Sequence, residues 1–298
     1  MKHSLAKLAA AALVAAPVSA SASLIIHEGF NYTIGANNPD PDGGLNGGNG
    51  LPATNVGGSP SGTSIGFRGA YGTTLDVGAG LAYAQGNKVL DVVGGSGTPN
   101  NASWGTDVNI YRFMSPDPFI DQRIGASNSG GFGVDGSSLY FSMLARSEST
   151  ANAAFRIKLS GAFNMFVENT ADTWTFNPNA GGAVASTGAF TVSETALLVI
   201  RVDFVAGAGD VFSLWVNPEL GAPLGSASAT ITTASDWGSF SQLNLRPSTL
   251  DAMTLDEFRM GTALESVTPF TVIPEPASAA ALLGLGGLAF AAARRRRA

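Results

Sequence analysis

The feature that most constrains the fold of this chain is a series of short segments rich in β-branched and aromatic residues. Gly, Asn, Ser and Asp separate these segments, as turn residues separate the strands of an all-β protein. The segments are residues 138–146, 154–160, 197–205, 211–217 and 254–260. The chain also holds 38 glycines, too many for a helical protein, and its interior lacks a long apolar stripe of helical period. The sequence therefore predicts an all-β fold.

Alternation within the segments predicts which side chains face the core. In residues 197–205 one set of alternate positions is wholly apolar and should point inward. This set is Leu198, Ile200, Val202 and Phe204. Residues 197–218 read as a hairpin with a Gly-Ala-Gly-Asp turn. In the last segment, Glu257 and Arg259 share the face opposite Phe258, which predicts an ion pair on the surface.

The C-terminal tail combines three elements in a fixed order. Pro274, Glu275 and Pro276 are followed by an uncharged apolar run, residues 277–293, and then by four arginines, Arg294, Arg295, Arg296 and Arg297. Seventeen helical residues span roughly 26 Å, close to the thickness of a hydrocarbon core. We expect a transmembrane helix whose arginines stay on the cytoplasmic side. The alternative is a buried helix with a basic end, but the run lacks a polar face.

The N-terminus has the composition of a secretory signal peptide. Lys2 and Lys7 precede an apolar stretch, residues 8–18, and a small-residue cleavage site at 18–20 or 20–22. Residues 1–22 are therefore predicted to be a signal peptide helix, leaving residues 23–270 as one β-sandwich domain and 271–298 as a sorting signal.

Together the two ends resemble the PEP-CTERM class of bacterial surface proteins. The matching residues are 272–276, the apolar stretch 282–290 and the terminal arginines. The resemblance implies signal peptidase and exosortase, a membrane-embedded cysteine protease-transpeptidase, as processing partners. It also implies cleavage near Pro274-Glu275-Pro276. The protein would be anchored briefly in the inner membrane and then released or transferred to the cell surface or an exopolysaccharide matrix.

Charge and cysteine content exclude several functions. Without the two signals, ten basic and twenty-one acidic residues remain, so the mature domain carries a charge near −11. This acidity argues against nucleic acid as a partner. The chain contains no cysteine, which excludes disulfides, thiolate nucleophiles and zinc-thiolate sites.

Three stretches resemble exported proteins with a concanavalin A-like, laminin-G-type jelly roll. They are residues 25–35, the hairpin 197–218 and residues 255–263. The resemblance implies two antiparallel sheets in a jelly-roll sandwich.

The catalytic inventory of the mature chain is small. His27 is the one histidine outside the signal peptide, and ordinary packing or edge exposure is expected for it. Jelly-roll glycanases use carboxylates at alternate positions of one strand, whereas Asp256 and Glu257 are neighbours and should point to opposite faces. We therefore expect no catalytic residues, with a glycan-active hydrolase or lyase as the alternative.

Two weaker patterns concern ligands. Asn38, Asp40 and Asp42 place oxygen ligands at alternate positions, like the first half of a calcium loop, although position twelve is Asn49. Calcium is thus a possible cofactor, and a plain glycine-rich surface loop is the alternative.

Tryptophans provide the second pattern. Trp104 and Trp237 have loop-like neighbours and are candidates for stacking on sugars, while burial is the commoner fate of tryptophan. The sequence thus predicts a non-enzymatic surface or matrix protein that binds an extracellular polysaccharide or a surface protein. A purely structural surface component is the alternative.

Overall fold

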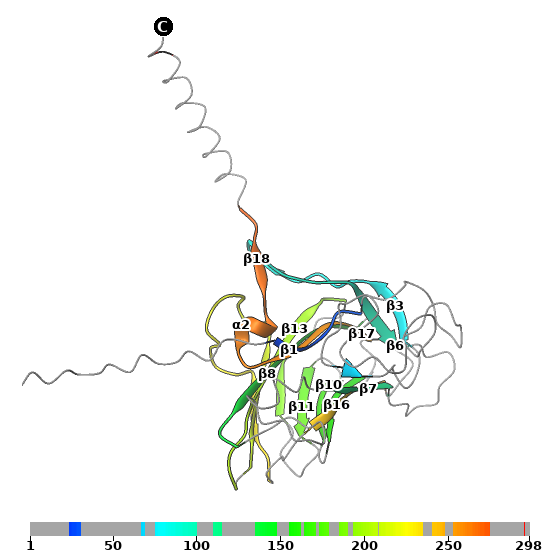
Figure 1. Cartoon of the computed structure of the whole chain (residues 1–298), viewed down its shortest axis with the longest axis vertical. Coiled ribbons are helices and arrows are strands. Elements are labelled where there is room, and N and C mark those ends of the chain that lie inside the picture. The colour runs from blue at the N-terminus through cyan, green and yellow to red at the C-terminus, as the bar shows by residue number, and fades with distance from the viewer. Residues whose placement is uncertain are drawn as a thin grey trace, which may run out of the picture.

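The computed structural model describes thirteen internal ranges of the chain and one residue near its end. They are 24–30, 67–68, 75–99, 110–114, 135–147, 155–161, 164–170, 173–178, 185–189, 193–207, 209–234, 240–247, 253–274 and 295. Within them the regular structure is almost entirely antiparallel β-strand, with one short helix, α2 (Leu264–Val267) (Figure 1). The prediction of an all-β antiparallel sandwich is confirmed.

The two predicted helices of the signals lie outside these ranges. This applies to the signal peptide, residues 1–22, and to the apolar run, residues 277–293. Among the residues that are described, none belongs to a helix of the length and apolarity needed to span a bilayer.

Among the described residues, the largest sheet contains eight strands. Seven follow the order β15-β14-β13-β8-β17-β6-β3, and β1 pairs with β17 as well. The bounds are β1 Leu24–Glu28, β3 Leu75–Ala79, β6 Gly95–Pro99, β8 Ser138–Ser147, β13 Ala196–Asp203, β14 Val211–Val216, β15 Ala229–Thr232 and β17 Met253–Gly261. The predicted segments 138–146, 197–205, 211–217 and 254–260 correspond to β8, β13, β14 and β17.

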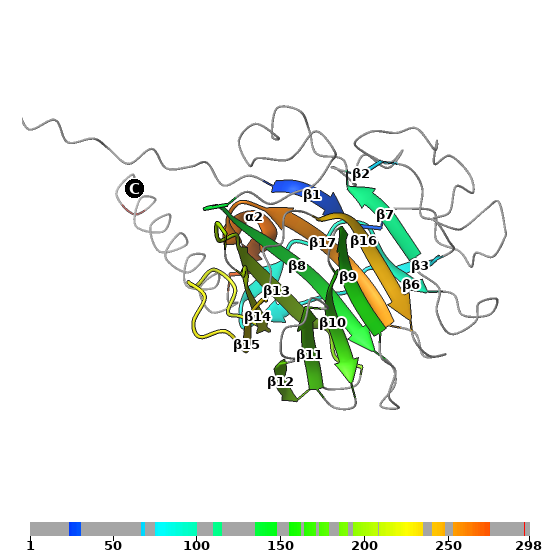
Figure 2. The ribbon, with the colours of Figure 1, turned by 90° about the horizontal axis from the view of Figure 1, so that it is seen from below.

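The second sheet contains seven strands in the order β12-β11-β10-β9-β16-β7-β2. Their bounds are β2 Phe67–Arg68, β7 Ile110–Met114, β9 Phe155–Gly161, β10 Asn164–Thr170, β11 Thr173–Pro178, β12 Ala185–Ala189 and β16 Phe240–Pro247. The predicted segment 154–160 is β9. Figures 1 and 2 show this sheet lying across one face of the eight-stranded sheet, which is the arrangement of a sandwich.

The predicted hairpin is present between β13 and β14. The two strands pair antiparallel, with Ile200 opposite Leu214. Asn217 closes the far end in a left-handed conformation, with a φ of 53°, and its side-chain oxygen accepts a hydrogen bond of 2.8 Å from the Leu197 amide. Asparagine tolerates this backbone region better than most residues, which explains its place at the end of the strand.

A third, small sheet covers the outer face of the eight-stranded sheet. It consists of β4 (Ala84–Gln85), β5 (Lys88–Leu90) and β18 (Phe270–Val272), in the order β18-β5-β4. Its apolar side chains pack with residues of β8 and β13 in one buried cluster. The members are Leu81, Tyr83, Leu90, Leu144, Leu197, Val199 and Leu220. Leu197 and Val199, on the face of β13 opposite the predicted core, are therefore fully buried too.

The last long strand, β17, departs from regular alternation. Its pairing with β8 shifts between Asp256 and Arg259, and Glu257 has a φ of 52°. Every residue of β17 is buried as a result. The predicted pair of Glu257 and Arg259 exists, but the expectation that it lies on the surface was wrong, because the bulge and the chain segment above β17 enclose both side chains.

Candidate functional site

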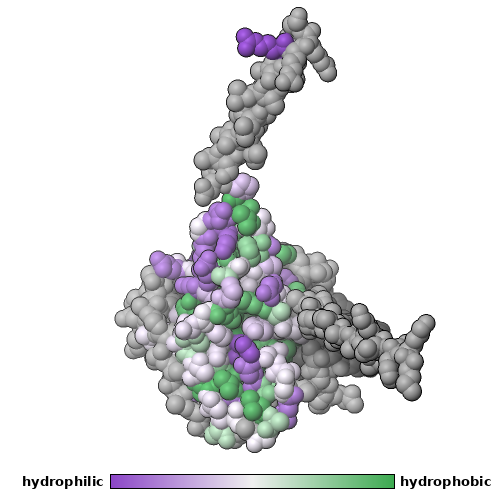
Figure 3. All heavy atoms as spheres, turned by 90° about the vertical axis from the view of Figure 1, so that its left-hand side faces the viewer, coloured by the Kyte–Doolittle hydropathy of each residue, from purple (hydrophilic) through white to green (hydrophobic). Residues whose placement is uncertain are grey.

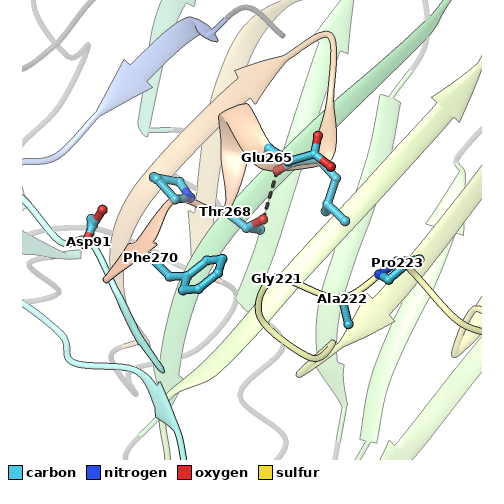
Figure 4. Close-up of a pocket in the computed structure, with 9 residues that line it drawn as sticks. Asp91, Gly221, Ala222, Pro223, Glu265, Thr268 and Phe270 are labelled. Carbon is cyan, nitrogen blue, oxygen red and sulfur yellow. Dashed lines mark hydrogen bonds between the residues drawn. The ribbon is translucent and has the colours of Figure 1, made fainter. Parts of the chain in front are cut away.

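The region where the described chain leaves the domain contains a groove. We call this region the tail-exit face; it consists of the small sheet, residues 217–225 and α2. The groove has a volume of about 550 Å³. It is lined by Asp91, Gly221, Ala222, Pro223, Leu264, Glu265, Thr268, Pro269 and Phe270. Figure 4 shows Phe270 between Asp91 on one side and the turn at Gly221 on the other.

The Phe270 ring packs against Gly221. Gly221 has a φ of 70°, and a Cβ at this position would lie 2.3 Å from Cζ of Phe270. Both the backbone conformation and the contact with the ring therefore require glycine here. From β5, the strand that pairs with β18, Lys88 places its Nζ 5.8 Å from the ring centroid. The aromatic wall of the groove is thus fixed by contacts from two sides.

Lys88 also connects the small sheet to the turn. Its Nζ donates to the Leu220 carbonyl at 2.5 Å and to Glu219 Oε1 at 3.3 Å. Gln85 makes further bonds to the same turn, including one from the Leu220 amide to Gln85 Oε1 at 2.8 Å. A second hollow of about 440 Å³ lies at this contact between the β4–β5 hairpin and residues 217–219. The small sheet is therefore tied to the turn by polar bonds as well as by apolar packing.

The polar side chains of the groove come from two places, the end of β5 and α2 with its cap. Asp91, just after β5, accepts a hydrogen bond of 2.7 Å from Thr271 Oγ1 of β18. Thr268 uses its hydroxyl to cap α2 by donating to the Leu264 carbonyl at 2.9 Å, drawn as a dashed line in Figure 4. Glu265 is exposed in the first turn of α2. The groove thus offers an aromatic ring and carboxylate oxygens to a ligand.

Buried charged side chains of β17 hold the connection between β3 and β6, residues 80–94, which contains β4 and β5 of the small sheet. Arg259 donates from Nη2 to the Asp91 carbonyl at 2.5 Å, and the Val93 amide donates to Glu257 Oε1. Asp256 Oδ2 accepts from the Leu81 amide at 2.8 Å. These three residues of β17 therefore satisfy backbone groups on both sides of β4 and β5. The role is structural, because the bonds give partners to main-chain groups that lie in partly or fully buried positions.

The same cluster contains the one mature histidine. His27 Nε2 lies 2.8 Å from Glu257 Oε2, and Arg259 Nε lies 2.8 Å from the same oxygen. Burial alone would raise the pKa of Glu257, but the hydrogen bond from His27 and the charge of Arg259 outweigh it and lower that pKa. Glu257 is therefore ionised and His27 donates to it. His27 packs in the interior through this contact, with its side chain 11% exposed.

Asp256 behaves in the opposite way. Burial raises its pKa to about 8, although the amides of Leu81 and Glu257 both donate to its oxygens. Two adjacent carboxylates thus titrate in different directions because one contacts His27 and Arg259 and the other does not. Both side chains are at most 1% exposed, so neither can reach a polymeric substrate.

Most of the site residues predicted from sequence lie outside the described part of the chain. These are the calcium candidates Asn38, Asp40 and Asp42, the tryptophans Trp104 and Trp237, the motif residues Glu275 and Pro276, and Arg294, Arg296 and Arg297. Pro274 and Arg295 are described, and both are exposed. Among the described residues, no group of three or more His, Asp or Glu is placed to hold a metal ion.

Sequence reasoning did not find the groove. Its residues come from three separate parts of the chain, and the last of these reaches Phe270, where the run 270–273 before Pro274 begins. Figure 3 shows polar and apolar residues side by side at the upper end of the domain, where this run lies.

Comparison with known protein families identifies the C-terminal segment. Residues 272–297 match the PEP-CTERM protein-sorting motif. The motif indicates an exported protein that is held at the membrane by its C-terminus before an exosortase processes it. No curated protein matches the chain.

Solved structures resemble the domain only distantly. An endo-β-1,4-glucuronan lyase from Trichoderma reesei is 8% identical, with a TM-score of 0.38 over 65% of this chain and 97% of the lyase. A galectin from Caenorhabditis elegans is 13% identical, with a TM-score of 0.30 over 44% of this chain and 88% of the galectin. The binding domain of botulinum neurotoxin serotype D/C is 10% identical, with a TM-score of 0.36 over 63% of this chain and 46% of that one.

Proposed function

We propose that this protein is an exported, non-enzymatic component of the cell surface or exopolysaccharide matrix, released from its membrane anchor by an exosortase, and that its sandwich binds an extracellular polysaccharide. The observation that carries the proposal is the direct continuity between the last strand, β18, and the sorting motif that begins at residue 272. A β-domain joined this closely to a sorting signal is the part of the chain that remains after processing.

The groove on the tail-exit face supports the choice of a polysaccharide ligand. Its volume of about 550 Å³ falls in the range of small-ligand sites. Phe270 supplies an aromatic surface for the apolar face of a sugar ring, and Asp91 and Glu265 supply acceptors for its hydroxyl groups. A neutral or cationic polysaccharide fits best, because the mature domain is acidic.

Burial of the acidic cluster argues against Asp256 and Glu257 as catalytic residues. Hydrolysis of a glycoside needs two carboxyl groups that reach the scissile bond. Asp256 and Glu257 are enclosed by the chain and bonded to backbone amides.

A purely structural surface component is the second candidate. It is favoured by the internal use of Asp91, whose Oδ1 is already bonded to Thr271 and whose carbonyl is bonded to Arg259. In that case the groove residues serve only to hold β18 in place.

Binding to the polysaccharide of the producing cell tests the proposal. The processed protein is purified from its host and titrated with that polysaccharide by isothermal calorimetry. Ala222→Trp fills the groove and should weaken binding at least about tenfold, while Ala206→Trp, on the exposed turn after β13, should not. No binding by the unmodified protein would favour the structural candidate, and equal binding by the two variants would place the ligand elsewhere.

A further inference from the structure

The last strand and the sorting motif share residues. β18 ends at Val272, and the Ile273 amide donates to the Asn87 carbonyl at 2.7 Å. The motif begins at residue 272. Val272 and Ile273 therefore belong to both the folded sheet and the segment that identifies the chain to its processing enzyme.

Several contacts hold the chain on the domain up to this point. Phe270, Thr271 and Val272 pair in register with Leu90, Val89 and Lys88. The Thr271 hydroxyl adds its bond to Asp91, and the Phe270 ring lies against Gly221. The chain is thus fixed to within one residue of Pro274.

The short distance to the membrane makes this pairing matter. Three residues, Pro274, Glu275 and Pro276, separate Ile273 from the apolar run 277–293. Four fully extended steps cover at most roughly 14 Å. An enzyme that is embedded in the membrane and binds the motif must therefore come close to the folded small sheet.

Recognition of an extended peptide uses its main-chain groups as well as its side chains. For residues 272 and 273 some of these groups are already bonded to β5. We propose that β18 separates from β5 before an exosortase can bind the chain at the start of the motif, residues 272–274. This inference rests on the proposed processing by an exosortase.

The position of β18 in the sheet permits such a separation. It is a three-residue strand at the edge of the small sheet. Val272 and Ile273 are 51% and 54% exposed, so release of these two residues uncovers little further apolar surface, whereas Phe270 at the start of the strand packs against the buried cluster. Short edge strands with few buried contacts are the parts of a protein that open locally most often.

A disulfide between the two strands tests the requirement for separation. Lys88 and Val272 are directly opposite and, because the Ile273 amide bonds to Asn87, they form a non-hydrogen-bonded pair with close side chains. The natural chain has no cysteine that could interfere. The Lys88→Cys/Val272→Cys chain is followed in its host by pulse-chase, with the disulfide verified by thiol alkylation. The oxidised form should mature at least about tenfold more slowly than the same variant kept reduced.

A second disulfide provides the matched control. Ser213 and Thr230 are opposite each other on β14 and β15, with their hydroxyl oxygens 3.3 Å apart. Ser213→Cys/Thr230→Cys should mature at the same rate in both redox states. Equal maturation of the oxidised and reduced Lys88→Cys/Val272→Cys chains would overturn the inference.

A loosening variant decides the question if the disulfide fails to form. Thr271→Ala removes the bond to Asp91 and should raise the maturation rate about threefold, because binding follows opening. Thr230→Ala, which loses a similar exposed bond to Ser213, should leave it unchanged. An unchanged or lower rate for Thr271→Ala would contradict the inference.

Failure of the proposed processing gives a different result. Replacement of Pro274, Glu275 and Pro276 by alanines should block maturation. If that triple variant matures normally, the proposed function fails. If it is blocked while the verified Lys88–Val272 disulfide has no effect, only strand separation is refuted.

Discussion

Removal of the Glu257 charge should destabilise the domain more than any comparable change on its surface. Glu257→Gln keeps the size of the side chain but leaves the Arg259 guanidinium without its counter-charge. The two side chains are 1% and 4% exposed, so water cannot replace the lost partner. Breaking a buried pair by neutralising one member costs about 3–5 kcal/mol of the free energy of unfolding.

The structure gives a reason to expect the upper part of this range. Glu257 receives hydrogen bonds from His27, from Arg259 and from the Val93 amide. A glutamine offers one acceptor oxygen in place of two, and its amide group would face other donors. For a domain of this size the loss corresponds to a melting temperature lower by about 10 °C.

Asp203→Asn is the matched control. Asp203 pairs with Arg201 at 2.6 Å, but these side chains are 30% and 40% exposed. Exposed pairs contribute at most about 1 kcal/mol. Urea unfolding followed by tryptophan fluorescence gives both free energies. A loss of less than about 1 kcal/mol for Glu257→Gln, similar to that of Asp203→Asn, would refute the assignment of the buried pair as the main attachment of residues 91–93.

Three other predictions concern pH, backbone and packing. The raised pKa of Asp256, about 8, means that this carboxyl group keeps its proton to a higher pH in the folded state than in the unfolded state. The free energy of unfolding, measured by urea titration, should therefore fall as the pH rises from 5 to 8. An increase over this range would contradict the prediction. Gly221→Ala should cost about 1–3 kcal/mol more than Gly86→Ala in urea unfolding, because both glycines have positive φ but only Gly221 has a ring where the Cβ would stand. Leu197→Ala and Leu198→Ala should each cost about 2–5 kcal/mol by the same measurement, because both side chains are buried. If the small sheet did not cover the outer face of β13, Leu197 would be exposed and Leu197→Ala would cost much less than Leu198→Ala.

The strands were predictable because their patterns are local. Residues 197–218 alternate and turn within one continuous stretch, and the structure places β13 and β14 there in the expected pairing. The third sheet was not predictable in this way. β4, β5 and β18 are two or three residues long, too short to show a period, and their partners are far apart in the chain.

The site was less accessible to sequence reasoning than the fold. Alternation predicted that Glu257 points to solvent, but the bulge in β17 and the segment around Val93 enclose it. The groove depends on Gly221 meeting Phe270, a contact that no local pattern records. The sorting motif, in contrast, was recognisable because its meaning lies in the order of its residues rather than in a tertiary contact.

Strand β18 also determines when the domain can finish folding. Thr271 and Asp91, which bond across the small sheet, are 180 residues apart. During export from the N-terminus, β5 crosses the membrane long before β18, so Leu90 and the cluster around it stay partly exposed until β18 arrives. The sheet closes only when residues 270–272 emerge, and the sorting motif follows immediately. Completion of the fold therefore coincides with arrival of the motif at the membrane, and a chain halted before residue 270 would remain an unfinished, aggregation-prone intermediate.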